Sequence, residues 1–243
     1  MTKIKKRYGK WGGYLPHCVD RNVPSRITIE EVKEPKYQYY LQVNDKFFRL
    51  NLALASDTYR TMGFMTYGVL LFLIIGRLSI GEEISYFGSF VFFLLGSLFM
   101  LYYYKHPKKE LVLDRIAGEI TFPNYFYGKP FKMPFKDCLV AWSVKNAGVV
   151  PSGPSLSLFH PNGFTSTDIN ISGIDVLEDW CFMVWYMDKN RPLPPGSAFD
   201  QYRQQDFERR KAEGFPKPLF PGSFPTPEFT KKQQAERKRV GGW

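Results

Sequence analysis

Histidines, cysteines and paired carboxylates are the residues with which a chain of this size would carry out acid–base, nucleophilic or metal chemistry. The three histidines, His17, His106 and His160, lie in unrelated contexts, so no metal-ligand spacing appears. His160 begins the turn sequence HPNG, which predicts a surface turn residue, and His106 follows an apolar segment. The sequence contains no glycine-rich phosphate loop, nucleophile elbow or paired-cysteine motif. It therefore predicts no enzyme, no cofactor and no metal.

The cysteines and one acid–base pair are interpreted as structural. Cys18, Cys138 and Cys181 are widely separated, and no two of them have ligand or redox spacing. Cys138 and Cys181 fall in segments expected in a core, so we predict buried free thiols. Asp114 and Arg115 occupy a predicted hairpin corner, where the aspartate is interpreted as a turn former.

Two long apolar segments dominate the first half of the chain. Residues 62–75 carry no charge, the apolar character continues to Ile80 with only Arg77 interrupting it, and a second uncharged run covers residues 84–104. A membrane-spanning helix needs about 20 residues to cross roughly 30 Å of hydrocarbon. Both segments are apolar on every helical face, whereas a core helix of a soluble domain usually keeps a polar side. They predict a two-helix transmembrane hairpin at 59–104, with helices at about 61–80 and 84–104.

The distribution of basic residues predicts the orientation of this hairpin. Lysines and arginines are frequent before the first segment, and Lys105, Lys108 and Lys109 follow the second, whereas the short GEE loop between the segments is acidic. Basic residues close to a membrane stay preferentially on the cytoplasmic side. We therefore expect both termini in the cytoplasm. Arg77, Lys105, Lys108 and Lys109 are the predicted membrane-interface residues, with Arg77 extending its side chain to the interface.

The formal net charge of +10 fits a position close to anionic lipid headgroups. Nucleic acid is the alternative partner of a basic chain. The basic residues flank the apolar segments and do not form a separate arm with interleaved aromatic residues. Membrane lipids are therefore expected as partners, and nucleic acid is not.

The predicted cytoplasmic parts are mainly antiparallel β-structure. Residues 1–24 are a basic, glycine-rich arm, and residues 25–58 hold three predicted strands, RITIEEV, YQYYLQV and FFRLNLAL, the last two joined by a turn at 44–46. In residues 105–190, strands ELVLD and EITF meet at a turn over 115–118, and KMPF, CLVAWSV, SLSLF and TDINI follow. Whether the strands before and after the hairpin share one sheet stays open.

One amphipathic helix is predicted to close this β domain. The apolar residues Val176, Trp180, Val184 and Met187 recur at helical spacing, and Ser172 with Asp175 resembles a capping box. The fold class is therefore α+β, with the helix packed against the sheet.

Residues 191–243 form a proline-rich and helical tail. RPLPPG ends the preceding helix, Ser197 and Asp200 can cap a new one that stops at Gly214, and Thr226 with Pro227 predicts the start of a last helix. The segment FPKPLFPGSFPTPE must be extended because each proline fixes φ and lacks a donor. Two interpretations remain: a strap packed on the β domain, which we favour, or a polyproline-type ligand. In the second, Phe215, Phe220 and Phe224 are the partner-binding residues.

Two resemblances bear on function. The order of a two-span hairpin and an antiparallel β domain at 105–190 with one terminal helix resembles membrane-anchored bacterial proteins with pleckstrin-homology-like domains. The segments YMDKNRPLPPG and GFPKPLFPGSFPTPE resemble uncharacterised two-span membrane proteins associated with bacterial type VI secretion effector loci.

The second resemblance implies a protein of the bacterial inner membrane, namely an accessory or immunity protein that acts by protein–protein binding on a toxin or secretion component. Two alternatives are a membrane-anchored scaffold for a cytoplasmic partner or lipid headgroups, and a membrane enzyme with an unrecognised site. The identity of the partner and the oligomeric state are left open.

Overall fold

The structure is a computed structural model that describes residues 23–24, 26–33, 40–52, 56–83, 85–105, 109–124, 128–147, 150–160, 166–169, 175–222 and 224–243. It divides into two compact units, each described here by itself. The hairpin unit comprises residues 51–110 and 124–129, and the folded unit comprises the rest. Most of the predicted arm at 1–24 lies outside the described residues.

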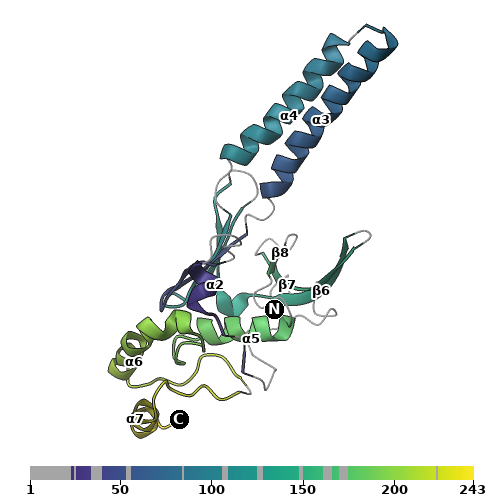
Figure 1. Ribbon diagram of the computed structural model, residues 1–243. Coiled ribbons are helices and arrows are strands. Elements are labelled where there is room, and N and C mark those ends of the chain that lie inside the picture. Colours follow the sequence, from purple (N-terminus) through teal and green to yellow (C-terminus); the bar gives the residue numbers. More distant parts are fainter. Residues whose placement is uncertain are drawn as a thin grey trace. The chain divides into compact units, whose positions relative to one another are not determined.

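Two long antiparallel helices make up most of the hairpin unit, α3 at Ser56–Ile80 and α4 at Tyr86–Lys105 (Figure 1). Glycines let them approach closely. A Cβ atom added at Gly96 would lie 2.7 Å from the Tyr67 ring, and one added at Gly63 would lie 2.8 Å from Met100 Sδ. The Tyr67 hydroxyl also forms a hydrogen bond with Ser97 Oγ over 2.9 Å. The two helices therefore pack on each other through small residues and one polar contact.

The outer surface of the hairpin is apolar. Phe72, Ile80 and Phe87 are 76%, 77% and 80% exposed. The segments Thr58–Ile80 and Tyr86–Lys105 are long and apolar enough to cross a membrane. The predicted pair of long apolar helices is confirmed, although α3 begins before the predicted residue 61.

A five-stranded antiparallel sheet forms part of the folded unit, with strand order β1-β2-β3-β4-β5. Strands β2 and β3 are neighbours although the whole hairpin separates them in sequence, so the strands before and after the hairpin share one sheet. Asn44 Oδ1 accepts the N–H groups of Lys46 and Phe47 in the predicted turn between β1 and β2. The strands are β1 at Tyr40–Val43, β2 at Phe47–Asn51, β3 at Glu110–Asp114, β4 at Glu119–Phe122 and β5 at Phe131–Pro134.

The prediction of a strand at RITIEEV is wrong, because residues Ile29–Lys33 form the short helix α2. Thr28 and Glu31 form a reciprocal capping box: Thr28 Oγ1 accepts the Glu31 N–H at 3.3 Å, and Glu31 Oε2 accepts the Thr28 N–H at 2.7 Å. These two bonds satisfy donors at the helix start and outweigh the β-preference of Ile27, Ile29 and Val32.

A separate three-stranded antiparallel sheet holds the later strands, in the order β6-β7-β8. The strands are β6 at Val140–Ala147, β7 at Val150–Phe159 and β8 at Ser166–Ile169. The predicted strands CLVAWSV, SLSLF and TDINI are thus present with shifted ends, while the turn marker at 161–163 and Gly148 lie outside the described residues. The strands form two sheets, and the pleckstrin-homology-like resemblance stays a prediction.

Helix α5 at Val176–Met187 is buried on all sides, and so differs from the predicted amphipathic helix. Its Phe182 ring lies 5.5 Å from Phe48 of β2, and its Trp185 ring stacks 5.0 Å from Phe224 of the tail. The tail therefore covers the side that was expected to face water. The cap is Asp175, whose side chain accepts the Leu177 and Glu178 N–H groups, while Ser172 lies outside the described residues.

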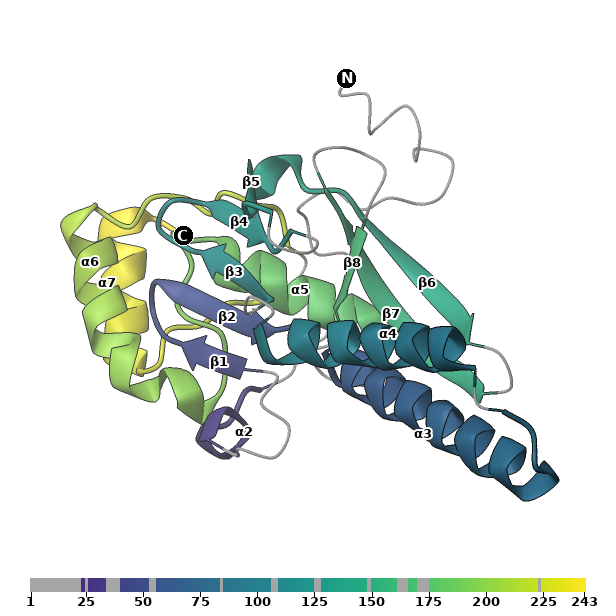
Figure 2. The ribbon, with the colours of Figure 1, turned by 90° about the horizontal axis from the view of Figure 1, so that it is seen from above.

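The tail contains a 3₁₀ helix at Ser197–Tyr202, α6 at Arg203–Ala212 and α7 at Lys231–Gly241. Gly214 follows α6 with φ 77°, as predicted for a C-terminal stop. The predicted start at Thr226 is wrong, because Thr230 caps α7 in a capping box with Gln233. Figures 1 and 2 show α6 and α7 side by side, and Lys211 and Glu236 join them at 2.8 Å.

Candidate functional site

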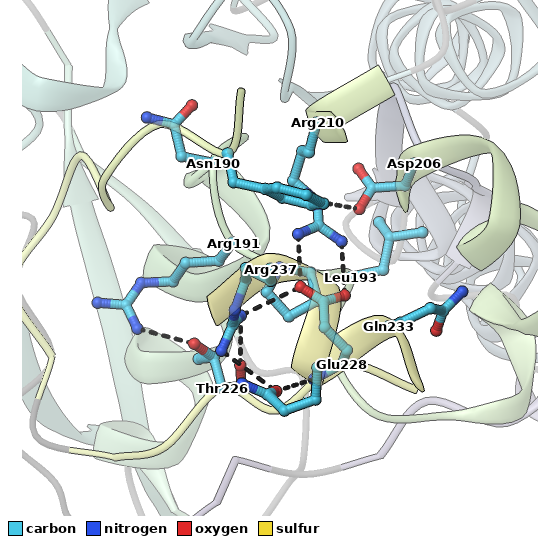
Figure 3. Close-up of polar contacts among 12 residues, drawn as sticks. Asn190, Arg191, Leu193, Asp206, Arg210, Thr226, Glu228, Gln233 and Arg237 are labelled. Atoms are coloured by element: carbon cyan, nitrogen blue, oxygen red, sulfur yellow. Dashed lines mark hydrogen bonds and ion pairs between the residues drawn. The ribbon is translucent and has the colours of Figure 1, made fainter. Parts of the chain in front are cut away.

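Charged side chains are buried in the C-terminal part of the folded unit. Burial of a charge is costly unless a partner of opposite charge lies beside it. Here the buried arginines and acids contact one another in one network, which we call the arginine network (Figure 3). Its buried members are Arg115, Arg191, Arg210, Arg237, Asp188, Asp206 and Glu228.

Glu228 lies between two of the arginines. Arg210 donates to both of its carboxylate oxygens over 2.7 and 2.8 Å, and Arg237 Nη1 donates to Oε1 over 3.1 Å (Figure 3). Burial lowers the pKa of Arg210, but its hydrogen bonds and charge interactions with Glu228 and Asp206 outweigh burial and raise that pKa. Glu228 therefore fastens the extended segment before α7 to both tail helices.

Asp206 of α6 likewise contacts more than one arginine. It lies 3.3 Å from Arg115, 3.0 Å from Arg209 and 2.9 Å from Arg210. Burial by itself would raise the pKa of Asp206, but the three guanidinium groups outweigh it and hold that pKa below its ordinary value. The carboxylate is therefore held in its charged form.

Arg115 links the five-stranded sheet to this network, a role that the sequence analysis missed. Its side chain is fully buried at the β3–β4 turn and donates to the backbone carbonyls of Asp188 and Arg191. Its Nε and Nη1 atoms have no partner among the described residues, and burial lowers its pKa. The neighbouring Asp114 accepts the Ala117 N–H at 2.9 Å, which confirms the predicted turn former.

The segment Asp188–Arg191, part of the motif behind the second resemblance, holds the proline-rich tail. Asp188 Oδ2 accepts from Arg191 Nε at 3.1 Å and from the Phe220 N–H at 3.2 Å. Arg191 also donates to the Phe220 carbonyl over 2.9 Å, and Asn190 donates to the Lys217 carbonyl over 2.6 Å. The motif residues therefore fix the path of the tail after α6.

The aromatic residues of the tail pack on their own chain. Phe215 and Phe224 are 1% and 5% exposed. Phe215 lies 5.3 Å from Phe207, and Phe220 lies 5.6 Å from Phe135 in an edge contact. This is the geometry of a strap, so we assign these three rings to packing and look elsewhere for a partner surface.

A groove of about 650 Å³ lies beside the arginine network in the folded unit. Arg203 fixes one wall by donating to the carbonyls of Leu193, Pro194 and Gly196 over 2.9–3.1 Å. Its guanidinium also lies 5.3 Å from the ring of Phe229, which is 65% exposed. The groove thus offers prolines, an exposed ring and a few fixed polar groups. Its lining includes Val23, Arg26, Thr28, Trp185, Pro195, Asp200, Pro225 and Pro227.

The predicted membrane-interface residues belong to the hairpin unit. Arg77 donates to the Glu83 carbonyl over 2.8 Å across the loop end. Lys105 is the last residue of α4, and Lys109 donates to the Asn124 carbonyl. Lys108 lies outside the described residues.

The other chemical candidates of the sequence are mostly structural. The prediction of a surface turn for His160 is wrong, because it is buried with its ring 4.7 Å from Phe122 and its Nε2 atom 2.6 Å from Thr167 Oγ1. Burial lowers the pKa of His160. His17, His106 and Cys18 lie outside the described residues, and among the residues described no group of histidines, cysteines and acids is suited to hold a metal ion.

The two other cysteines differ from each other. Cys138 is buried and free, as predicted, and burial raises the pKa of its thiol to about 12. Cys181 is buried as well, but the prediction of a free thiol is wrong, because Cys181 is disulfide-bonded. Pairing among three distant cysteines cannot be deduced from their spacing.

No family model, curated protein or solved structure matches this chain. Both resemblances drawn from the sequence therefore stay predictions. The hairpin, the groove and the arginine network are the features of the structure that bear on function.

Proposed function

We propose that this protein is a membrane-anchored immunity or accessory protein of a bacterial type VI secretion system, which acts by binding a protein toxin. The observation that carries the proposal is the outward-facing apolar surface of α3 and α4. The arginine network and the groove favour binding over catalysis.

The dimensions and the ends of the hairpin support anchoring. The 23 residues of Thr58–Ile80 correspond to roughly 35 Å of helix, enough to cross a bilayer core. At one end the Tyr59 and Tyr102 rings lie 4.5 Å apart, and Arg60 lies 5.6 Å from the Tyr103 ring. Tyrosines and cations of this kind favour the membrane–water interface. Under this proposal both termini lie in the cytoplasm, an orientation that the basic flanks of the hairpin favour.

Binding by the folded unit is supported by how its charged groups are used. The buried acids Asp188, Asp206 and Glu228 each pair with at least one arginine and hold the tail in place. The groove, in contrast, presents prolines and the exposed Phe229. Its lining also includes the charged residues Arg26, Asp200, Arg203 and Glu228. An exposed aromatic ring beside polar and charged groups is typical of a protein-binding site.

The immunity role comes from the resemblance to proteins of type VI secretion effector loci. Neutralisation needs a binding surface and no catalytic group, and an anchor would place that surface where a membrane-active toxin arrives. With only a short loop outside, the toxin would be met in the bilayer or in the cytoplasm.

Survival of a deletion strain attacked by its siblings tests this role. We expect self-killing, rescue by the wild-type gene, and weaker rescue by Phe229→Ala, which removes the exposed ring of the groove. Leu219→Ala is the matched control, because Leu219 is 51% exposed and does not line the groove. Unaffected survival of the deletion strain would overturn the immunity role.

Two further measurements separate anchoring from partner choice. We expect the full chain to require detergent for extraction and tags at both ends to be shielded from a periplasmic label in intact cells. Labelling at either end would overturn the orientation. Co-purification of one toxin encoded nearby would support immunity, whereas several envelope components would support the scaffold alternative.

A further inference from the structure

A second concavity, of about 430 Å³, lies where the strap meets α7. Its lining contains Arg191, Arg237 and Lys238 and no acidic residue. Thr226 and Gln234 are its main polar neighbours, and the Phe224 and Trp243 rings form apolar walls. Figure 3 shows Arg191 and Arg237 on either side of Thr226. We call this concavity the basic pocket.

Both arginines of the basic pocket keep unused donors. A guanidinium has five N–H donors. Arg191 uses three of them, to Asp188, to Thr226 Oγ1 at 3.3 Å and to the Phe220 carbonyl. Arg237 likewise uses three, to the Thr226 carbonyl, Glu228 and Gln234, and its Nε is buried without a partner among the described residues. Two donors of Arg191 and one Nη2 donor of Arg237 are therefore left for a ligand, since the Arg237 Nε atom is buried.

The lining side chains of the pocket carry three positive charges and no negative one, while Asp188 and Glu228 pair with Arg191 and Arg237 from outside the lining. Glu228 is a single carboxylate that serves both Arg210 and Arg237. Lys238, exposed on the last turn of α7, adds a further cation. Burial lowers the pKa of Arg237, and the nearby Arg210 and Arg191 charges act in the same direction. A bound anion would relieve this repulsion.

We infer that the basic pocket binds a carboxylate of an acidic protein segment between Arg191, Arg237 and Lys238. Guanidinium groups match a planar carboxylate through paired N–H donors. The Phe224 and Trp243 walls, with Pro225 and Pro227, suit the apolar part of a peptide chain. The inference deepens the proposed function, and rests on it, because it names the chemistry by which the protein partner is recognised.

Fluorescence anisotropy with a labelled hexaglutamate peptide tests the inference on the full chain in mild detergent. We expect salt-sensitive binding that weakens about three- to fivefold in Lys238→Gln, because one exposed charge interaction is lost. Lys231→Gln is the matched control, since Lys231 is exposed on the same helix and does not line the pocket. No binding, or equal binding by wild type and Lys238→Gln, would overturn the inference.

A second variant keeps the test independent of folding defects. The Gln234 Oε1 atom already accepts from Arg237 Nη2 at 3.3 Å and from the Glu228 N–H at 2.9 Å. Gln234→Glu would therefore place a carboxylate at this edge of the pocket with its acceptor role intact. We expect peptide binding to fall at least tenfold while the thermal unfolding midpoint is retained; undiminished binding by this folded variant would count against the pocket.

Two other anionic ligands are tested separately, to distinguish a peptide carboxylate from a phosphate group. Inorganic phosphate and phosphatidylglycerol vesicles are compared with the peptide at equal ionic strength. Lys238-dependent binding to vesicles or phosphate without peptide binding would overturn the carboxylate assignment. The sibling-killing assay needs no pocket variant, so failure of this inference is distinguishable from failure of the immunity role.

Discussion

The hairpin unit and the C-terminal part of the folded unit place apolar and charged side chains in opposite ways. The hairpin exposes Phe72 and Phe87 and uses its glycines to bring two helices together. The tail buries Arg210 and Asp206 at 1% exposure and leaves much of its extended segment at the surface.

The contrast shows that each region is matched to different surroundings. Helices satisfy their own backbone donors and acceptors, so an apolar exterior is compatible with lipid. Charges in a protein interior are tolerated only where pairing offsets the cost of desolvation, as Glu228 does for two arginines. The hairpin should therefore respond to changes in helix packing, and the tail to the loss of single charges.

The largest effect is expected from Glu228→Gln, which leaves Arg210 and Arg237 buried without their shared carboxylate. Breaking a buried pair in this way costs about 3–5 kcal/mol. Urea unfolding followed by tryptophan fluorescence in mild detergent measures the loss. Glu236→Gln is the control, because its partner Lys211 is exposed, and the midpoint of that variant should stay close to wild type. Equal midpoints for both variants would contradict the structural role of the arginine network.

Acid should lower the stability of the folded unit to urea, because it protonates Asp206. Its folded-state pKa lies below the unfolded value of about 3.9, so its stabilisation is fully present above that pH. The stabilisation disappears as the pH falls through the folded-state pKa. Urea midpoints measured from pH 7 to pH 2 should therefore decline in wild type below about pH 4. The Asp206→Asn variant should lack the part of this decline that comes from protonation of Asp206. The Asp200→Asn variant, which changes a half-exposed acid, should decline as wild type does.

Helix packing in the hairpin is tested by Gly96→Leu. The added side chain would overlap the Tyr67 ring, and overpacking of this kind costs about 1–3 kcal/mol. Hydrogen exchange of α4 amides in detergent should become faster. Gly68→Leu, where an added Cβ meets open space, should leave exchange unchanged. Slow exchange in both variants would mean that the helices pack through another face.

The smallest effect concerns Cys138, whose buried thiol has a pKa of about 12. Because the thiolate is the reactive form, maleimide at pH 7.5 should not label Cys138 in the native protein. Labelling should appear in urea, and mass spectrometry of the labelled peptide measures its extent. A cysteine introduced by Lys231→Cys, at an exposed site, provides the positive control. Rapid native labelling of Cys138 would show that this core opens readily.

Local patterns predicted most elements of the fold. ELVLD and EITF alternate in the sequence as they do in burial, and the long apolar helices follow from uniform composition. Two errors in the secondary structure arose where two local signals competed. At Thr28–Glu31 the capping box stabilises a helix despite the β-branched residues around it. At the last helix, Thr230 and Gln233 form the cap, and not Thr226 with Pro227.

The arginine network and the groove could not be predicted in the same way. Arg115 looked like an ordinary turn residue, and its contact with Asp188 joins positions 73 residues apart. Asp206 and Arg210 have the i, i+4 spacing of a helical pair, but nothing in the sequence shows that Arg210 also contacts Glu228, 18 residues further along the chain. By contrast, the favoured interpretation of the proline-rich segment as a strap agrees with the stacking of Phe224 on Trp185. Contacts of high sequence separation carry no local periodicity, so only the folded chain shows them.

The adjacency of β2 and β3 sets an order of events during synthesis. The ribosome releases β1 and β2 first, then both long helices, and only afterwards the strand that must lie beside β2. The five-stranded sheet therefore stays incomplete until α3, α4 and then β3 have been translated. If α3 and α4 enter a lipid bilayer, the nascent chain must reach the translocation machinery before the five-stranded sheet is complete. During that time β2 lacks its neighbour β3.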